Sequence, residues 1–258
     1  MNPILVQIYE IQTPGEAESM VRLGVDHVGS VLLAEDRWKD RIIRNTVGEV
    51  QRLGARSSLI PLFHDEETLC RALEYYRPDI VHFCDMLEDD GSGNTVSDQL
   101  FNLQSRIRER FAGIRIMRSV PIPPAGNGAV DPVLAVARRF EAISDFFLTD
   151  TVMPSGNGAA EAQPVSGFVG ITGVPCNWAH ARSLVEASAI PVILAGGVSP
   201  ENVEAGIEAV HPAGIDSCTC TNAIGPDGRP VRFRKDPKRV EQLVEVVRRA
   251  EKRCPSQP

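Results

Sequence analysis

The sequence predicts an α/β barrel, and three observations lead to this fold class. Eight short apolar or alternating segments take turns with eight longer segments that carry helix signals. No linker rich in Pro, Gly or Ser divides the chain. The length of 258 residues suits a closed barrel, which typically runs to about 250 residues as one domain. An open doubly wound sheet is the alternative, but eight regular strand–helix units fit a (β/α)8 TIM barrel better. We therefore expect residues 1–258 to form one such domain.

The strands are expected from short runs that alternate or are rich in β-branched residues, as in a parallel sheet buried on both faces. The first run alternates, and the seventh, Pro-Val-Ile-Leu-Ala, is continuously apolar and ends in two glycines. The expected strands cover residues 4–11, 27–33, 57–63, 80–85, 114–122, 145–151, 191–195 and 213–219.

Helix signals follow each strand. Thr13-Pro14-Gly15-Glu16 offers a hydroxyl cap, a proline at the first helical position and a carboxylate three residues after the cap, and Gly24 would end that helix. Ser199-Pro200-Glu201 is expected to open the seventh helix directly after two glycines. The expected helices cover residues 14–23, 42–53, 65–76, 97–111, 132–143, 177–187, 200–210 and 237–253.

Polar loops that contain glycine follow the fourth, fifth, sixth and eighth strands, at residues 88–94, 123–128, 154–167 and 224–230. The loop at 154–167 is long, small and polar, which is typical of a mobile segment. All four loops follow carboxyl ends of parallel strands, so they belong to the end of the barrel where active sites are built. We expect the functional site at this end.

Composition narrows the class of partner. The net charge of −7 argues against a nucleic-acid partner. No stretch approaches the roughly 18–20 apolar residues of a membrane helix, and the N-terminus shows no signal-peptide pattern. Six cysteines without C-x-x-C spacing indicate free thiols in a cytoplasmic protein. We expect no nucleic-acid or membrane partner, and either a monomer or a homodimer.

The turns after the seventh and eighth strands are the best candidate for binding a ligand. Gly196-Gly197 precedes a helix, and backbone N–H groups at such a turn suit a phosphate. Cys218-Thr219-Cys220 supplies small residues and a hydroxyl at the end of the eighth strand. Loops after these two strands are the recurrent phosphate site of barrels. The alternative is that the glycines only allow a tight turn.

Asp150, at the end of the sixth strand, is a candidate general acid. Apolar neighbours such as Phe147 and Leu148 would raise its pKa. A capping or ion-paired carboxylate is the alternative. Further on, Thr172 and Gly173 belong to a Gly-Ile-Thr-Gly stretch that would suit a closing loop touching the ligand.

The first strand ends in Tyr9 and Glu10, one of which could face the barrel mouth. Glu10 could act as a base or a hydrogen-bonding anchor, or it could face solvent. Arg118 interrupts the apolar fifth strand near its end. A charge there needs either an acidic partner or an anionic ligand, so Arg118 is a candidate for substrate binding.

The fourth strand ends in His82-Phe83-Cys84-Asp85, which could support nucleophilic or acid–base catalysis. His82 and Cys84 lie two residues apart and share one face of the strand, while Asp85 begins the loop. His82 is more simply structural, which leaves Cys84 and Asp85 as the candidates. No further ligands stand out for a metal site, and we expect neither a metal nor a cofactor.

The chain resembles the phosphoribosylanthranilate isomerase family along nearly its whole length. The most specific motif is Leu-Ala-Gly-Gly-Val followed by Pro-Glu-Asn-Val at the seventh strand, close to the family's L-A/S-G-G-L-x-P-E-N-V. Other stretches similar to family motifs lie at residues 26–31, 81–85, 148–151, 170–178 and 235–236.

The resemblance implies an Amadori rearrangement that opens the ring of an aminated phosphoribose and forms a 1-deoxyketose without a cofactor. In the family a carboxylic acid protonates the furanose oxygen, and a cysteine takes a proton from C2 of the resulting imine. Asp150 matches the acid. The family's K-I-C-G, however, corresponds to Gln7-Ile8-Tyr9-Glu10, so Tyr9 stands in the place of the base. A tyrosine with an ordinary pKa of about 10 is a poor base at neutral pH.

Two further departures lie at strand ends. Cys84 replaces the histidine of V-Q-L-H-G, and Cys218-Thr219-Cys220 replaces S-S-G. Our leading interpretation is an isomerase-like barrel that transfers protons on a phosphorylated sugar with an altered reaction or substrate, using Glu10 or Asp85 as the replacement base. The alternatives are the family's own reaction in tryptophan biosynthesis with a replaced base, and a barrel that binds a phosphorylated ligand without catalysis.

Overall fold

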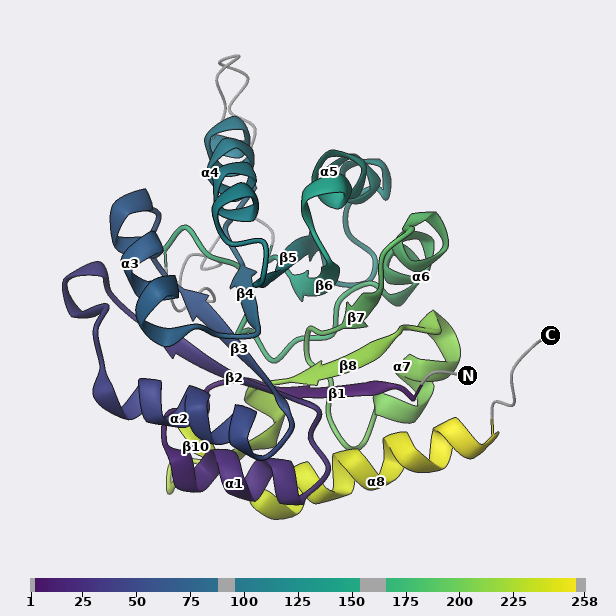
Figure 1. Cartoon of the computed structure of the whole chain (residues 1–258). Coiled ribbons are helices and arrows are strands. Elements are labelled where there is room, and N and C mark those ends of the chain that lie inside the picture. The colour runs from purple at the N-terminus through teal and green to yellow at the C-terminus, as the bar shows by residue number, and fades with distance from the viewer. Residues whose placement is uncertain (1–2, 88–95, 154–165, 254–258) are drawn as a thin grey trace.

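The computed structural model describes residues 3–87, 96–153 and 166–253. Most of the loops expected at 88–94 and 154–167 therefore lie outside the described residues. Eight parallel strands close into a barrel in chain order, with β1 paired to both β2 and β8. Figure 1 shows the strands in the middle of the molecule and the helices around them. The predicted TIM barrel is confirmed.

The elements follow one another as strand and helix around the ring. The strands are β1 (Leu5–Ile8), β2 (His27–Leu32), β3 (Arg56–Pro61), β4 (Ile80–Phe83), β5 (Arg115–Ile122), β6 (Phe146–Thr151), β7 (Val192–Leu194) and β8 (Gly214–Ser217). The helices are α1 (Pro14–Arg22), α2 (Arg41–Arg52), α3 (Glu66–Tyr76), α4 (Val96–Arg110), α5 (Asp131–Phe140), α6 (Trp178–Ala187), α7 (Val203–Val210) and α8 (Pro237–Arg253). No helix within the described residues is long and apolar enough to cross a membrane.

Local sequence explains where several helices begin. Thr13 caps α1 through its side chain, which accepts the N–H of Glu16, and Pro14 is the first helical residue, as predicted. The predicted end of α7 is confirmed, but its predicted start was wrong, because residues 199–202 form a turn and the helix starts only at Val203. Asn202 supports this turn, since its side chain accepts the N–H of Ser199 and donates to the carbonyl of Gly197.

An antiparallel hairpin, β9 (Asn222–Ile224) and β10 (Pro230–Lys235), lies between β8 and α8. The sequence had predicted only a loop over part of this stretch. Its arginines and lysine break the apolar pattern by which a strand is recognised. The hairpin matters for the site because it carries Arg232 and Lys235 to the strand ends.

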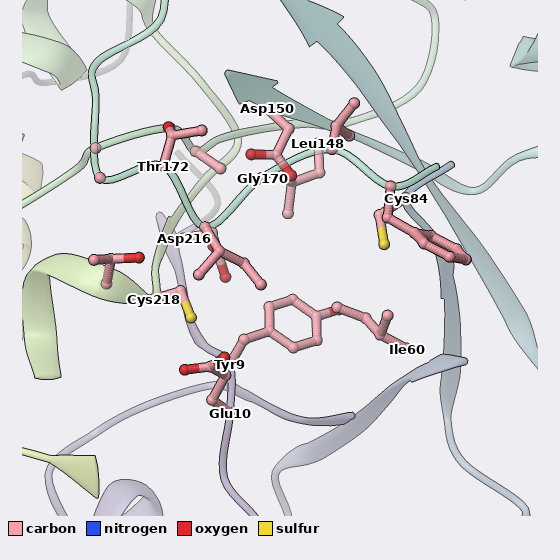
Figure 2. A pocket seen from close by; sticks show the side chains of 18 of the residues that line it. Tyr9, Glu10, Ile60, Cys84, Leu148, Asp150, Gly170, Thr172, Asp216 and Cys218 are labelled. Carbon is pink, nitrogen blue, oxygen red and sulfur yellow. The ribbon is translucent and has the colours of Figure 1, made fainter. Parts of the chain in front are cut away.

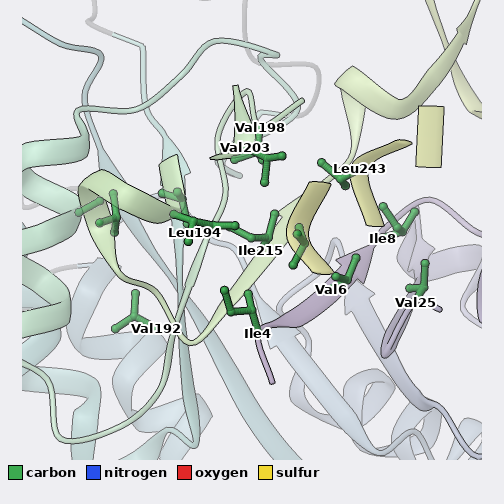
Figure 3. Packing of buried hydrophobic residues seen from close by; sticks show 14 of the residues in the cluster. Ile4, Val6, Ile8, Val25, Val192, Leu194, Val198, Val203, Ile215 and Leu243 are labelled. Carbon is green, nitrogen blue, oxygen red and sulfur yellow. The ribbon is translucent and has the colours of Figure 1, made fainter. Parts of the chain in front are cut away.

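Alternation along the strands separates two faces. Outward side chains such as Val6 and Ile8 of β1, Leu194 of β7 and Ile215 of β8 belong to the apolar layer between the strands and helices (Figure 3). The inward face is mixed. It combines apolar residues such as Met117 and Leu148 with the buried polar residues Gln7, His27, Ser58, His82, Ser119 and Asp216. Such a polar interior is stable only when its members are hydrogen-bonded.

Candidate functional site

A pocket opens where the carboxyl ends of the strands meet (Figure 2). It holds about 790 Å³ of free space, including the part that is open to solvent, a size that suits a small molecule. The predicted site residues that line it are Tyr9, Glu10, Cys84, Asp150, Thr172, Gly173, Gly196, Gly197, Cys218, Thr219 and Cys220. The structure therefore brings together residues from strand ends that lie far apart in the sequence.

Asp150 is an inward-facing carboxyl at the end of β6. Burial and the nearby Asp216 carboxylate raise its pKa to about 7, although the N–H of Thr151 donates to its side chain and opposes the shift. The backbone of Gly170 lies directly over it, because a Cβ at Gly170 would come within 2.5 Å of the carboxylate oxygen Oδ2. A carboxyl that titrates near neutral pH in an apolar site can give a proton to a substrate.

Asp216, on β8, is a pocket residue that the sequence analysis did not single out. It is 6% exposed, and the side-chain amide of Gln7 donates to its Oδ1 at 3.1 Å. Burial raises the pKa of Asp216 to about 7, while the Gln7 hydrogen bond and the charge of Lys235 oppose the shift. Strand alternation was the available signal, since Asp216 lies two residues before Cys218 and so shares its inward face.

Tyr9 fills the interior of the barrel beneath the pocket. Its hydroxyl lies 2.6 Å from Ser58 Oγ and 2.8 Å from His82 Nδ1. Nε2 of His82 lies 2.9 Å from Ser119 Oγ, so the polar chain crosses the barrel from β1 to β5. Burial raises the pKa of Tyr9 well above its ordinary value and lowers that of His82 to about 3. Tyr9 is therefore neutral and held in place, which makes it unsuited to be a base.

The ring of Tyr9 also explains a glycine of β2. A Cβ at Gly29 would lie 2.0 Å from Cδ1 of Tyr9, so no other residue fits there while Tyr9 keeps its position.

Glu10 adopts a left-handed backbone with a φ of 64°, which is strained for a residue other than glycine. Its side chain is buried, with Oε1 2.6 Å from Arg232 Nη2, and Oε2 accepts the N–H of Phe233 at 3.3 Å. Phe233 is itself left-handed, with a φ of 60°. The glycine of the K-I-C-G motif suits this conformation, and in this chain contacts from the hairpin hold a glutamate in it.

The glycine turn after β7 lies at the floor of the pocket. Gly196 and Gly197 have φ values of 83° and 59°, and a Cβ at Gly197 would lie 2.4 Å from the nitrogen of Pro175. Their main-chain N–H groups donate no hydrogen bond to any described residue. Thr219 Oγ1, on the turn after the neighbouring strand β8, is buried and has no partner among the described residues either. These unpaired donors are the groups that a phosphate would use.

Arg118 and Asp85 do not line the pocket, and their predicted roles in substrate binding and catalysis are corrected here. Arg118 follows the inward-facing Met117 and so faces outward, where it is fully buried between the rings of Phe83 and Phe140. Its Nη1 donates to Asp85 Oδ2 at 2.6 Å. The alternative left open for Arg118, an acidic partner, is the one that the structure contains.

The Asp85 carboxylate is also bonded to His64. It is buried, and the Arg118 charge beside it keeps its pKa below the ordinary value. Asp85 is thus a structural anion that pairs with the buried Arg118.

The thiols of the site are protonated. Burial raises the pKa of Cys84 and of Cys218 well above that of a free cysteine, and neighbouring carboxylates act in the same direction. The described residues contain no group of three or more His, Cys, Asp or Glu side chains arranged to hold a metal ion. Of the titratable groups that line the pocket, only Asp150 and Asp216 have pKa values shifted to near neutrality.

Comparison with known proteins gives one consistent result. No family model matches the chain. The N-(5'-phosphoribosyl)anthranilate isomerase of Methanocella arvoryzae is 28% identical over 142 residues, which span 55% of this chain and only 54% of that protein. The isomerase of the same name from Methanothrix thermoacetophila is 26% identical over 250 residues, which span 94% of this chain and 97% of that protein.

Among solved structures, a phosphoribosyl anthranilate isomerase in complex with reduced 1-(o-carboxyphenylamino)-1-deoxyribulose 5-phosphate superimposes with a TM-score of 0.65. The superposition covers 95% of this chain and 98% of the isomerase chain, at 16% sequence identity, so this likeness concerns the fold alone. Along nearly its whole length the chain is thus similar to phosphoribosylanthranilate isomerases, and it shares their barrel fold.

Proposed function

We propose that the protein is an isomerase that converts a phosphorylated aldosylamine into an aminoketose by acid–base proton transfer, with Asp150 as the acid. The observation that carries this proposal is the position of Asp150: a partly buried carboxyl with a pKa of about 7 in the same pocket as the glycine turn. An acid of this kind is what ring opening of a glycosylamine needs, because the ring oxygen must be protonated as its bond to C1 breaks.

The phosphate is assigned to the turns after β7 and β8. The unpaired N–H groups of Gly196 and Gly197 and the hydroxyl of Thr219 support this assignment. The relatives are N-(5'-phosphoribosyl)anthranilate isomerases, which supports a phosphoribosylamine as the class of substrate. The place of Tyr9 and Glu10, in the position of the family's Cys-Gly, supports an altered substrate or a slower reaction.

The test is turnover of N-(5'-phosphoribosyl)anthranilate and of phosphoribosylamines with other amine groups, followed by the appearance of the ketose. We expect turnover of at least one of them, and we expect Asp150→Asn to lose it by about 10²-fold or more while keeping its affinity for a phosphorylated product analogue. Glu109→Gln, an exposed carboxylate on α4, is the matched control. An inactive protein whose ligand affinity does not depend on Asp150 would be a binding barrel, and the proposal would fail.

A second experiment addresses the altered first strand. The wild-type protein should not restore growth to a tryptophan auxotroph that lacks this isomerase, because Tyr9 is held as a neutral hydrogen-bonding residue. The double variant Tyr9→Cys, Glu10→Gly should turn over N-(5'-phosphoribosyl)anthranilate faster than the wild type. Robust complementation by the wild type would contradict the altered function.

A further inference from the structure

An isomerase of this type needs a base as well as an acid, and Tyr9 does not serve as one. Its hydroxyl is bonded to Ser58 and His82, and its ring is wedged against Gly29. Glu10, the replacement suggested by the sequence, has both carboxylate oxygens occupied by Arg232 and Phe233.

Asp216 is the remaining carboxylate in the pocket. It lies on β8, the strand that closes the barrel against β1, and its register partner there is Gln7. Gln7 is two residues before Tyr9, so the side chain that holds Asp216 belongs to the strand on which the family carries its cysteine. Figure 2 shows Asp216 and Asp150 both bordering the cavity, above the ring of Tyr9.

We propose that Asp216 is the general base of this site, and that Gln7 positions it by donating a hydrogen bond to its carboxylate. This proposal rests on the proposed function, since it assigns the second proton transfer of the same reaction. The base would thus have moved from the end of β1 to the adjacent strand β8.

The proton transfers balance without a cofactor. Asp150 gives its proton to the ring oxygen as the C1–O bond breaks, and the nitrogen lone pair forms the C1–N double bond. Asp216 takes the proton from C2, the C–H electron pair forms the C1–C2 double bond, and the C–N π pair returns to nitrogen. Conversion of the resulting enol into the ketone places a proton on C1 and releases the hydroxyl proton, which restores both carboxyl groups to their starting states.

The first strand also departs from the family motif at Gln7, and this change fits the assignment of Asp216 as the base. The family motif K-I-C-G has a lysine where this chain has Gln7. On this backbone, a lysine at position 7 would place an ammonium group against Asp216, because the Gln7 amide nitrogen already lies 3.1 Å from Oδ1. A neutral donor holds the carboxylate without adding a positive charge beside it. Such a charge would weaken Asp216 as a base.

Several titratable groups act on Asp216 and enter its pH dependence. Tyr9 faces it from the end of β1, Asp150 from β6 and Lys235 from the end of β10, and Cys218 directly follows β8. Tyr9 and Cys218 are neutral, so the Asp150 carboxyl and the Lys235 ammonium are the charges that matter. The two carboxyls form a coupled pair, and the active form has Asp150 protonated and Asp216 ionised.

The experiment measures kcat/KM against pH, for the phosphoribosylamine that the wild-type protein turns over fastest, in the wild type and four variants. Asp216→Asn should lower turnover by about 10²- to 10⁴-fold and leave affinity for the ketose product analogue within a few-fold. Gln7→Lys should move the acidic limb of the pH profile to lower pH, and Gln7→Met, which removes the donor, should move it to higher pH. Glu109→Gln should change neither quantity.

The outcomes separate the two proposals. Wild-type turnover that is lost in Asp150→Asn but kept in Asp216→Asn would overturn the role of Asp216 and leave the isomerase standing. The Gln7 variants keep the Asp216 carboxylate itself intact. If their pH profiles coincide with that of the wild type, the role of Asp216 as the base would likewise be overturned. Absence of turnover on every phosphoribosylamine in the wild type would overturn the isomerase, and the base with it. Opposite shifts in Gln7→Lys and Gln7→Met would support the base.

Discussion

Asp150→Asn should make the protein more stable at alkaline pH while it removes activity. Asparagine has nearly the same shape, and its Oδ1 can still accept the N–H of Thr151. The change removes an ionisable group whose charged form is disfavoured by burial and by Asp216. Because the pKa of Asp150 is raised in the folded protein, replacing this residue should increase the free energy of unfolding more at high pH than at low pH.

The raised pKa of Asp150 determines the pH range over which stability changes and the size of that change. A carboxyl that moves from 3.8 in the unfolded chain to about 7 in the folded protein contributes its full stability below pH 3.8, and that contribution is lost as pH rises to about 7. By linkage the loss is about 2 kcal/mol at pH 5 and about 4 kcal/mol at pH 8. The variant lacks this loss, so its advantage over the wild type should grow by about 2 kcal/mol between pH 5 and pH 8.

Urea unfolding at pH 5, 6, 7 and 8 measures this growth, and thermal unfolding should show it as a relative rise in Tm of about 4–8 °C. The constant difference between the two side chains cancels when the pH values are compared. Glu109→Gln again controls for the loss of one negative charge. A stability difference between Asp150→Asn and the wild type that stays flat from pH 5 to pH 8 would refute the reasoning, because it would mean that Asp150 is not a buried, charge-destabilised carboxyl.

Three further outcomes are expected. Gly29→Ala should cost about 1–3 kcal/mol of stability through its clash with Tyr9, and urea unfolding should show most of that cost absent in a Tyr9→Cys background; an equal cost in both backgrounds would contradict the contact. Arg118→Met should destabilise the protein by about 3–5 kcal/mol because it leaves Asp85 buried without its partner, and the double variant with Asp85→Asn should be more stable than this single variant by the same assay. Thr219→Val should weaken binding of inorganic phosphate by about 1 kcal/mol in calorimetric titration without lowering Tm; unchanged affinity would remove the hydroxyl from the phosphate site.

The parts of the fold that depend on local pattern could be predicted from the sequence. Apolar runs and capping residues such as Thr13 specify the eight strand–helix units. The sequence also places Asp150 at a strand end, and the structure shows that it lines the pocket. Predicting the face of β5 on which Arg118 lies requires the register of that strand to within a single residue, because a shift of one residue exchanges inside and outside. A charged residue in an apolar run does not reveal that register.

Other features of the site arise only from contacts between distant segments. The pKa of Asp150 depends on Asp216, and the strained backbone of Glu10 depends on Arg232 in a hairpin whose charged residues hid its strands. Burial and charge coupling of this kind are properties of the assembled barrel. Motif comparison located the altered first strand, but the role of Gln7 emerged from its contact with the last strand.

The pairing of β1 with β8 also has a consequence for synthesis of the chain. Gln7 lies on the first barrel strand, and Asp216, 209 residues later, is made only after the other seven barrel strands. Their contact exists only once the ring is complete. A chain that ends before β8 contains Gly196, Gly197 and Asp150 but lacks the carboxylate that we assign as the base. Asp150 and the proposed base therefore come to share one pocket only when β8 closes the ring against β1.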